Sequence, residues 1–143
     1  MSPTLFHSGT RDFLAYWSGL SEPGRVPPRR AFDPMAMGRA ATRLFSAEKA
    51  GPATRLRLAG NWIETLHDQP LAGKLWQTVW HRSSHGQIAD TVQQCLSQGQ
   101  PMVLAARDAA QTIDLQITLV PFRDRQGMTT RLIGLYQPAL DTS

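Results

Sequence analysis

The stretch TIDLQITLVP, residues 112–121, alternates apolar and polar side chains along most of its length. The apolar positions are Ile113, Leu115, Ile117 and Leu119, and the positions between them are Asp114, Gln116 and Thr118. Successive side chains of a strand point to opposite faces of a sheet, so this period of two predicts a strand with one buried face and one wetter face. Such a strand is typical of an antiparallel sheet.

Two more strands are predicted beside this one. Residues 101–107 come before it, and residues 129–136 come after it, beyond the polar turn at 123–127. The end of the chain therefore contains three predicted strands.

Another pair of strands is predicted earlier in the chain. Residues 43–49 and 54–59 are joined by a turn that contains glycine and proline. In the second of them we expect Leu56 and Leu58 on one face, with the neighbouring arginines on the other. The total is five strands.

An N-terminal helix is predicted before the first strand. Thr10 is placed to cap it, and its apolar face holds Phe13, Leu14, Trp17 and Leu20. A proline-fixed connector, residues 24–34, follows this helix. At its end Asp33-Pro34 is predicted to begin a short second helix, with the aspartate as cap.

Further helices are predicted between the two groups of strands. Trp62 and Leu66 follow a helical spacing, residues 71–80 suggest short helices, and residues 87–97 form the clearest helix, with Gly99 as its stop. This order predicts an α+β fold, a five-stranded antiparallel sheet with helices on one face and an added N-terminal helix. It lacks the β-α-β-α alternation of a doubly wound nucleotide fold.

Composition indicates one folded domain. Of the 143 residues, 41% are hydrophobic and 18% are charged. No apolar run approaches the roughly 20 residues that span a bilayer, and the first residues lack the pattern of a secretory signal. Cys95 is the single cysteine and cannot form an internal disulfide. We expect a cytoplasmic protein.

Positive charge is concentrated in the first part of the chain. Residues 1–57 contain nine basic and four acidic side chains, and residues 58–143 contain six basic and seven acidic ones, which gives the net charge of +4. The planar guanidinium of arginine suits carboxylate or phosphate partners. A solvated basic edge that pairs with local acids is the alternative interpretation.

Several short motifs resemble those of the PAS family. They are YW at 16–17, GR at 24–25, PRR at 28–30, DP at 33–34, RLAG at 57–60 and LAGKLW at 71–76. Their order and spacing are similar to those of a divergent branch of short, stand-alone bacterial PAS proteins, over residues 8–138. The chain departs from that branch at residues 61–62 and 67–69, where Gly-Thr and Gly-Arg-Glu are expected.

The resemblance implies a regulatory role and no enzymatic one. PAS domains bind small ligands between sheet and helices, or pair with other proteins through the sheet and the N-terminal helix. Stand-alone members resemble adaptors that modulate signalling proteins, including histidine kinases. The implied organisation is a helix and connector at 1–34, a PAS-like domain at 35–138 and a tail at 139–143. We expect a homodimeric module that acts by non-covalent protein contact, with a small-molecule sensor as the alternative.

Two sets of residues are candidates for these roles. The expected partner or dimer surface is Phe13, Trp17, Leu20, Arg25, Arg29 and Arg30. The expected ligand pocket is lined by Trp62, Leu66, Leu71, Trp76 and Ile88. Tryptophan gives a large contact area with one polar group, which suits either role, and core packing is the alternative.

Haem and flavin are both disfavoured. His81 and His85 lie just before the longest helix, where a haem-binding PAS domain could place an iron ligand, but their polar surroundings favour a solvated loop and helix cap. Cys95 lacks the Gly-Arg-Asn-Cys-Arg-Phe motif of flavin photosensors. Its apolar helical stripe is typical of a small buried side chain.

Catalytic and nucleic-acid signatures are missing from the sequence. It has no nucleophile elbow, phosphate loop, HExxH or CxxC motif, so an enzyme with an unrecognised site is the third hypothesis. Basic residues are not interleaved with aromatic ones along one helix or strand, and no direct contact with nucleic acid is expected.

Overall fold

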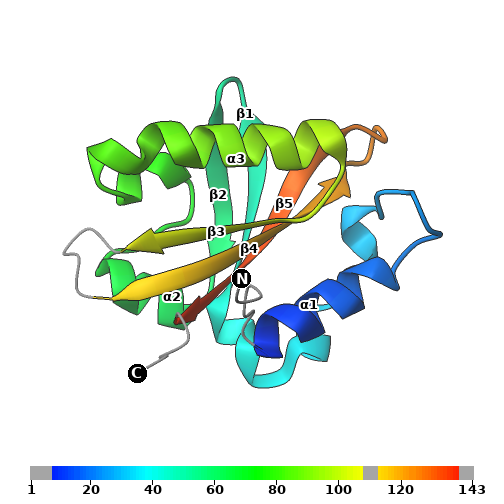
Figure 1. Cartoon of the computed structure of the whole chain (residues 1–143), viewed down its shortest axis with the longest axis horizontal. Helices are drawn as coiled ribbons and strands as arrows, with labels where there is room; N and C mark the ends of the chain where they lie inside the picture. Colours follow the sequence, from blue (N-terminus) through cyan, green and yellow to red (C-terminus); the bar gives the residue numbers. More distant parts are fainter. Residues whose placement is uncertain (1–7, 108–112, 139–143) are drawn as a thin grey trace, which may run out of the picture.

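The computed structural model describes residues 8–107 and 113–138. Its centre is an antiparallel sheet of five strands in the order β2-β1-β5-β4-β3 (Figure 1). The strands are β1 Leu44–Ala50, β2 Ala53–Ala59, β3 Met102–Arg107, β4 Asp114–Arg123 and β5 Thr129–Pro138. The predicted α+β fold with five antiparallel strands is confirmed. The tail expected at 139–143 lies outside the described residues.

Helices pack on both faces of this sheet (Figure 1). One face carries the helices that follow β2, which are α2 Asn61–His67, η3 Trp76–Val79, η4 Arg82–Ser84 and α3 His85–Gln98. The other carries those that precede β1, which are α1 Ser8–Ser18, η1 Arg29–Ala31 and η2 Pro34–Arg43. Within the described part of the chain, none of these helices combines the length and apolarity that a membrane span requires.

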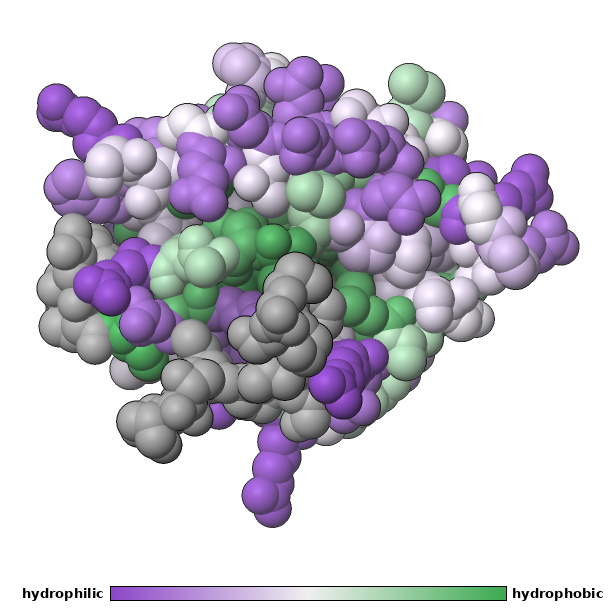
Figure 2. All heavy atoms as spheres, in the orientation of Figure 1, coloured by the Kyte–Doolittle hydropathy of each residue, from purple (hydrophilic) through white to green (hydrophobic). Residues whose placement is uncertain are grey.

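Helix α3 forms where the sequence predicts it. Ile88, Val92 and Cys95 are buried on the stripe that faces the sheet. The helix ends at Gly99, whose φ of 64° is the left-handed conformation that glycine adopts without strain. Figure 2 shows a hydrophilic surface over α3, with hydrophobic side chains gathered below it, over β3 and β4.

The prediction of a wetter sheet face is wrong for the central strands. Thr118, Val120 and Phe122 of β4 lie on the face that was expected to be wet, and all three are fully buried. Phe13 of α1 and Phe32 cover this face, and the Phe32 ring contacts the rings of Phe13 and Phe122 at centroid distances of 6.1 and 5.7 Å. The N-terminal helix therefore adds a second hydrophobic layer to the domain.

Two side-chain hydrogen bonds hold α1 on β4. Thr10 does not cap the helix as predicted, because α1 begins at Ser8 and Thr10 is buried inside it. Its Oγ1 donates to Oε1 of Gln116 at 2.9 Å, and Nε1 of Trp17 donates to the carbonyl oxygen of Pro121 at 2.9 Å. The helix is thus fixed by polar as well as apolar contacts.

The connector between α1 and η2 is bound to the end of β4. The backbone N–H of Arg123 donates to the carbonyl of Pro27 at 2.9 Å, and its Nε donates to the carbonyl of Val26 at 2.7 Å. At the end of the connector Asp33 caps η2 as predicted, since its Oδ1 accepts from the N–H of Met35 at 3.0 Å. Figure 1 shows the connector beside the β4–β5 turn.

Candidate functional site

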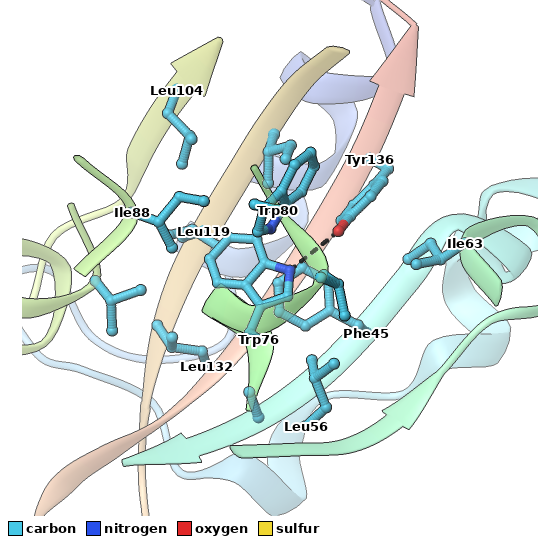
Figure 3. Close-up of a cluster of buried hydrophobic side chains, with 14 of the residues drawn as sticks. Phe45, Leu56, Ile63, Trp76, Trp80, Ile88, Leu104, Leu119, Leu132 and Tyr136 are labelled. Atoms are coloured by element: carbon cyan, nitrogen blue, oxygen red, sulfur yellow. Dashed lines mark hydrogen bonds between the residues drawn. The ribbon is translucent and has the colours of Figure 1, made fainter. Parts of the chain in front are cut away.

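The five residues predicted to line a pocket come together between the sheet and the helices. Leu71, Trp76 and Ile88 are at most 2% exposed and belong to one apolar cluster that reaches all five strands (Figure 3). Trp62 and Leu66 are half-buried against the same cluster. The structure therefore places these side chains where they were expected, but packed against one another. Ligand binding among them stays a prediction.

A chain of hydrogen bonds runs through this cluster. Nε1 of Trp76 donates to the hydroxyl of Tyr136 at 3.0 Å (Figure 3), and the same hydroxyl lies 2.9 Å from Nε2 of His67. The hydroxyl accepts from Trp76 and has one proton to donate, which fits a His67 protonated on Nδ1. Complete burial raises the pKa of Tyr136, opposed by the hydrogen bond from Trp76, so the hydroxyl stays protonated.

Aromatic rings surround these hydrogen bonds. Trp80 stacks on Tyr136 with centroids 5.8 Å apart, and Phe45 packs on Trp76 at 4.9 Å. His67 meets Trp80 edge-on at 4.9 Å. We call Phe45, His67, Trp76, Trp80 and Tyr136 the aromatic cluster. It occupies the space between α2, η3 and the sheet.

Sequence reasoning did not assign Phe45 or Tyr136 to this site. The sequence does contain one indication of this packing, which is Gly134. A glycine inside a predicted strand often marks the close approach of another group. Gly134 pairs with Phe45 across β1 and β5, and a Cβ at position 134 would overlap the Phe45 ring. The missing side chain leaves room for the Phe45 ring, which lies edge-on to Tyr136 at 87° and tilted by 34° from Trp76.

The two histidines considered as haem ligands lie just before α3 and at its first residue, and both bond to backbone groups. His81 is exposed, and its Nδ1 accepts from the N–H of Ser83 at 3.1 Å as the cap of η4. Nε2 of His85 lies 3.0 Å from the carbonyl oxygen of Trp80, to which it donates. Among the described residues, no three His, Cys, Asp or Glu side chains are grouped as metal ligands.

Cys95 is a buried side chain, as expected from its place on the helix. Its Sγ lies 3.7 Å from the carbonyl oxygen of Leu119. Burial raises the pKa of the thiol from 9.0 to about 12. The thiolate that nucleophilic or redox chemistry needs is therefore scarce at neutral pH.

The residues predicted to form a partner surface divide into two groups. Phe13 is fully buried against its own sheet, whereas Trp17 and Leu20 are only half-buried. Arg25 is exposed and 3.9 Å from Glu22, and Arg29 and Arg30 lie beside the β4–β5 turn. Phe13 is therefore not available to a partner in this fold, and a partner role for Trp17, Leu20 and the three arginines stays a prediction.

A groove of about 300 Å³ opens on the outer face of β1 and β2, beside η2. Its apolar lining includes Phe32, Leu44, Leu58 and Ile133. The expectation that Leu56 and Leu58 share a face is wrong, because the register between β1 and β2 shifts at Ser46 and Ala47. Leu56 is 1% exposed in the core, and Leu58 is 68% exposed on the opposite side.

A family model described as a PAS domain matches residues 5–137, nearly the whole chain. The chain belongs to the PAS domain family. It is thus a PAS-domain signalling module. A search of the curated proteins finds no significant match.

Several solved PAS and LOV structures share this fold. A light-oxygen-voltage domain from a flavin-analogue study has 15% identity and a TM-score of 0.57, over 75% of this chain and 84% of that one. Another is a domain of a Haloarcula marismortui protein that is described as a light and redox sensing histidine kinase. It has 15% identity and a TM-score of 0.54, and the match covers 68% of this chain and 90% of that one. A third is the N-terminal domain of a Marinobacter aquaeolei diguanylate cyclase with PAS/PAC sensor. It has 18% identity and a TM-score of 0.50, and the match covers 66% of this chain and 92% of that one. At these identities the likeness concerns the fold alone.

Proposed function

We propose that this PAS module acts by non-covalent contact with a histidine kinase and catalyses no reaction itself. The observation that carries the proposal is the packing of the aromatic cluster between the sheet and the helices. A ligand that entered this space would have to displace Trp76, which is completely buried and hydrogen-bonded to Tyr136. Breaking a buried hydrogen bond without replacing it costs about 1–3 kcal/mol, in addition to the lost packing.

The groove beside Leu58 is the surface that fits a protein partner. Large apolar side chains are exposed along it, since Leu58 is 68% exposed and Met35, next to the lining residue Pro34, is 83% exposed. Arg29 also lines the groove. A partner with one apolar anchor residue and a carboxylate beside it would fill the groove and pair with this arginine.

The test is the autophosphorylation rate of purified histidine kinases from the source organism, measured with and without the chain. We expect the chain to change the rate of at least one kinase and Leu58→Asp to abolish this effect. Met128→Asp is the matched control, because Met128 is 62% exposed but does not line the groove. The proposal fails if no kinase responds, or if Leu58→Asp acts like the unmodified chain.

A ligand sensor is the second candidate, favoured by one buried polar atom. Nε1 of Trp80 is buried and has no hydrogen-bond partner among the described residues. A ligand acceptor beside Trp80 would satisfy it, and a buried unpaired donor is otherwise costly. A small molecule that co-purifies with the chain and is lost in Trp80→Phe would establish this second function.

Location and assembly follow from the same proposal. Histidine kinases phosphorylate themselves in the cytoplasm, where the proposed contact would form. The predicted homodimer would present two copies of the groove, which suits a dimeric kinase. Trp17 and Leu20 are the residues that we propose for its interface.

A further inference from the structure

A second cavity, of about 340 Å³, lies between the connector and the β4–β5 turn, and basic side chains dominate it. Its lining consists of Pro28, one aspartate and five arginines, which are Arg29, Arg30, Arg123, Arg125 and Arg131. We call it the arginine pocket. These residues are far apart in the sequence and meet because Arg123 binds the carbonyls of Val26 and Pro27.

The arginine pocket contains the whole charge excess of the protein. Its five arginines and one aspartate give a formal charge of +4, equal to the net charge of the complete chain. All other positions together hold ten basic and ten acidic side chains. An otherwise balanced protein thus has its positive charge concentrated at one concave place, which raises the local concentration of anions.

The nearest carboxylates are already engaged. Asp124 accepts hydrogen bonds from the N–H groups of Gln126 and Met128 and from the hydroxyl of Thr130, at 2.6 to 3.0 Å. These bonds hold the pKa of Asp124 below its usual value and keep the carboxylate within the β4–β5 turn. Asp124 therefore builds the turn that carries Arg125.

The other nearby carboxylate, Glu48, is shared between two arginines. It lies 3.1 Å from Arg57 and 3.6 Å from Arg131. Within the described part of the chain, Arg29, Arg30 and Arg125 have no carboxylate at ion-pair distance. The arginine pocket thus has guanidinium groups available for an external anion.

The positive charge of Arg29 is repelled by neighbouring arginines, and a bound anion would relieve this repulsion. It is partly buried, and one terminal nitrogen makes a long contact of 3.5 Å with the carbonyl of Phe32. Burial, together with the charges of Arg131 and Arg57, lowers the pKa of Arg29. A bound anion would offset both effects, because it supplies opposite charge and acceptor atoms.

We propose that the arginine pocket binds a ligand with a short chain of two or three phosphoryl groups. Planar guanidinium forks bind phosphate oxygens in pairs, and a triphosphate carries about four negative charges near neutral pH. The volume is at the lower end of the range for small-ligand sites. The arginines converge on one pocket and form no stripe, which disfavours a nucleic-acid backbone. This site is separate from the aromatic cluster and shares only Arg29 with the groove beside Leu58. The proposal of a phosphoryl ligand does not rest on the proposed kinase contact.

The test is isothermal titration calorimetry of the full chain with inorganic triphosphate. The variant Arg30→Gln/Arg125→Gln removes two exposed arginines that form no ion pair with any of the residues that the structure describes. We expect it to weaken triphosphate binding by about tenfold or more, because the variant loses charge-assisted hydrogen bonds to the phosphoryl oxygens. Thermal unfolding of the free proteins checks that the variant is folded.

The matched control is Arg11→Gln/Arg82→Gln, which removes the same charge from exposed positions outside the arginine pocket. It should weaken binding by no more than about threefold, through the long-range field alone. Equal weakening by both double variants, or unchanged binding in Arg30→Gln/Arg125→Gln, would overturn the proposal. Competition by inorganic sulfate as effective as that by triphosphate would also overturn it.

Comparing the affinities of ATP, GTP and inorganic triphosphate shows whether the ligand is a free oligophosphate or a nucleotide. Equal affinities would assign the site to free oligophosphate or to any nucleotide tail. Tighter binding of one nucleotide would show that a base is also recognised. Either result supports an oligophosphate site, whereas binding of duplex DNA in preference to all three would contradict it.

Discussion

Nε1 of Trp76 lies 3.0 Å from the hydroxyl oxygen of Tyr136, and both side chains are completely buried between the sheet and the helices. One residue comes from a 3-10 helix and the other from the last strand, so the bond joins the two layers of the domain. It also engages two polar atoms, Nε1 of Trp76 and the Tyr136 hydroxyl, that a ligand in this space could otherwise contact. The proposed surface-contact function rests on this packing.

Removing the Tyr136 hydroxyl should destabilise the fold. In Tyr136→Phe the buried Nε1 of Trp76 loses its acceptor, which should lower the free energy of unfolding by about 1–3 kcal/mol in urea denaturation. Tyr16→Phe is the control, because the Tyr16 hydroxyl also accepts one hydrogen bond, from the N–H of Asp33 at 3.0 Å, but at an exposed site. If both variants lose the same free energy of unfolding, burial does not increase the contribution of the Trp76–Tyr136 hydrogen bond.

Gly134 should not tolerate a side chain. A methyl group at this position would overlap the ring of Phe45 and push it against Trp76 and Tyr136. We expect Gly134→Ala to lower the free energy of unfolding by about 1–3 kcal/mol. Gly86→Ala in α3 adds the same methyl group in open space and should be neutral or stabilising by up to about 1 kcal/mol. A Gly134→Ala protein as stable as the original would refute the packing described for Phe45.

The stability of the domain should fall in alkali, in part through Cys95. Burial raises the pKa of its thiol from 9.0 to about 12, so the folded state keeps a proton that the unfolded chain loses in this range. The free energy of unfolding must then decrease as the pH rises from 9 toward 12. Between pH 8 and 10, Cys95→Ala should lose about 1 kcal/mol less than the original chain. An identical decrease in both proteins would mean that Cys95 does not contribute to it.

Self-association is predicted to depend on the exposed part of α1 and the residues after it. Trp17 and Leu20 are only half-buried on their own sheet, and the rest of their surface is available to a second copy. We expect a dimer in size-exclusion chromatography with light scattering and a monomer for Trp17→Ala/Leu20→Ala. Circular dichroism must show that this variant is folded. A folded variant with the mass of the original chain would exclude these residues from the interface.

The sequence predicted the strands well because they carry strong local signals. Alternation in residues 113–119 located β4, and Gly99 marked the end of α3. It did not predict that both sheet faces are covered, because which helix packs on which face is a long-range property. The apolar run Leu119-Val120-Pro121-Phe122 does contain a signal, since a strand with apolar residues on both faces is typical of a sheet covered on both sides.

The candidate sites were harder to predict for the same reason. The residues expected to line a pocket lie in or against one apolar cluster. Tyr136, which accepts the hydrogen bond from Trp76, lies 60 positions further along the chain. The charge asymmetry pointed to Arg29 and Arg30, whereas residues 58–143 have a charge balance of −1. The arginines at 123, 125 and 131 are brought to the same place only by the fold.

The most direct test of the central claim is native mass spectrometry of the freshly purified chain, together with its absorption spectrum. If the aromatic cluster fills the interior, the measured masses will be those of the polypeptide or its dimer, and absorption will be that of tryptophan and tyrosine. A small molecule bound in stoichiometric amount that is retained by Arg30→Gln/Arg125→Gln and lost in Trp80→Phe would contradict the account. The interior would then be a ligand site, and the signal would begin there.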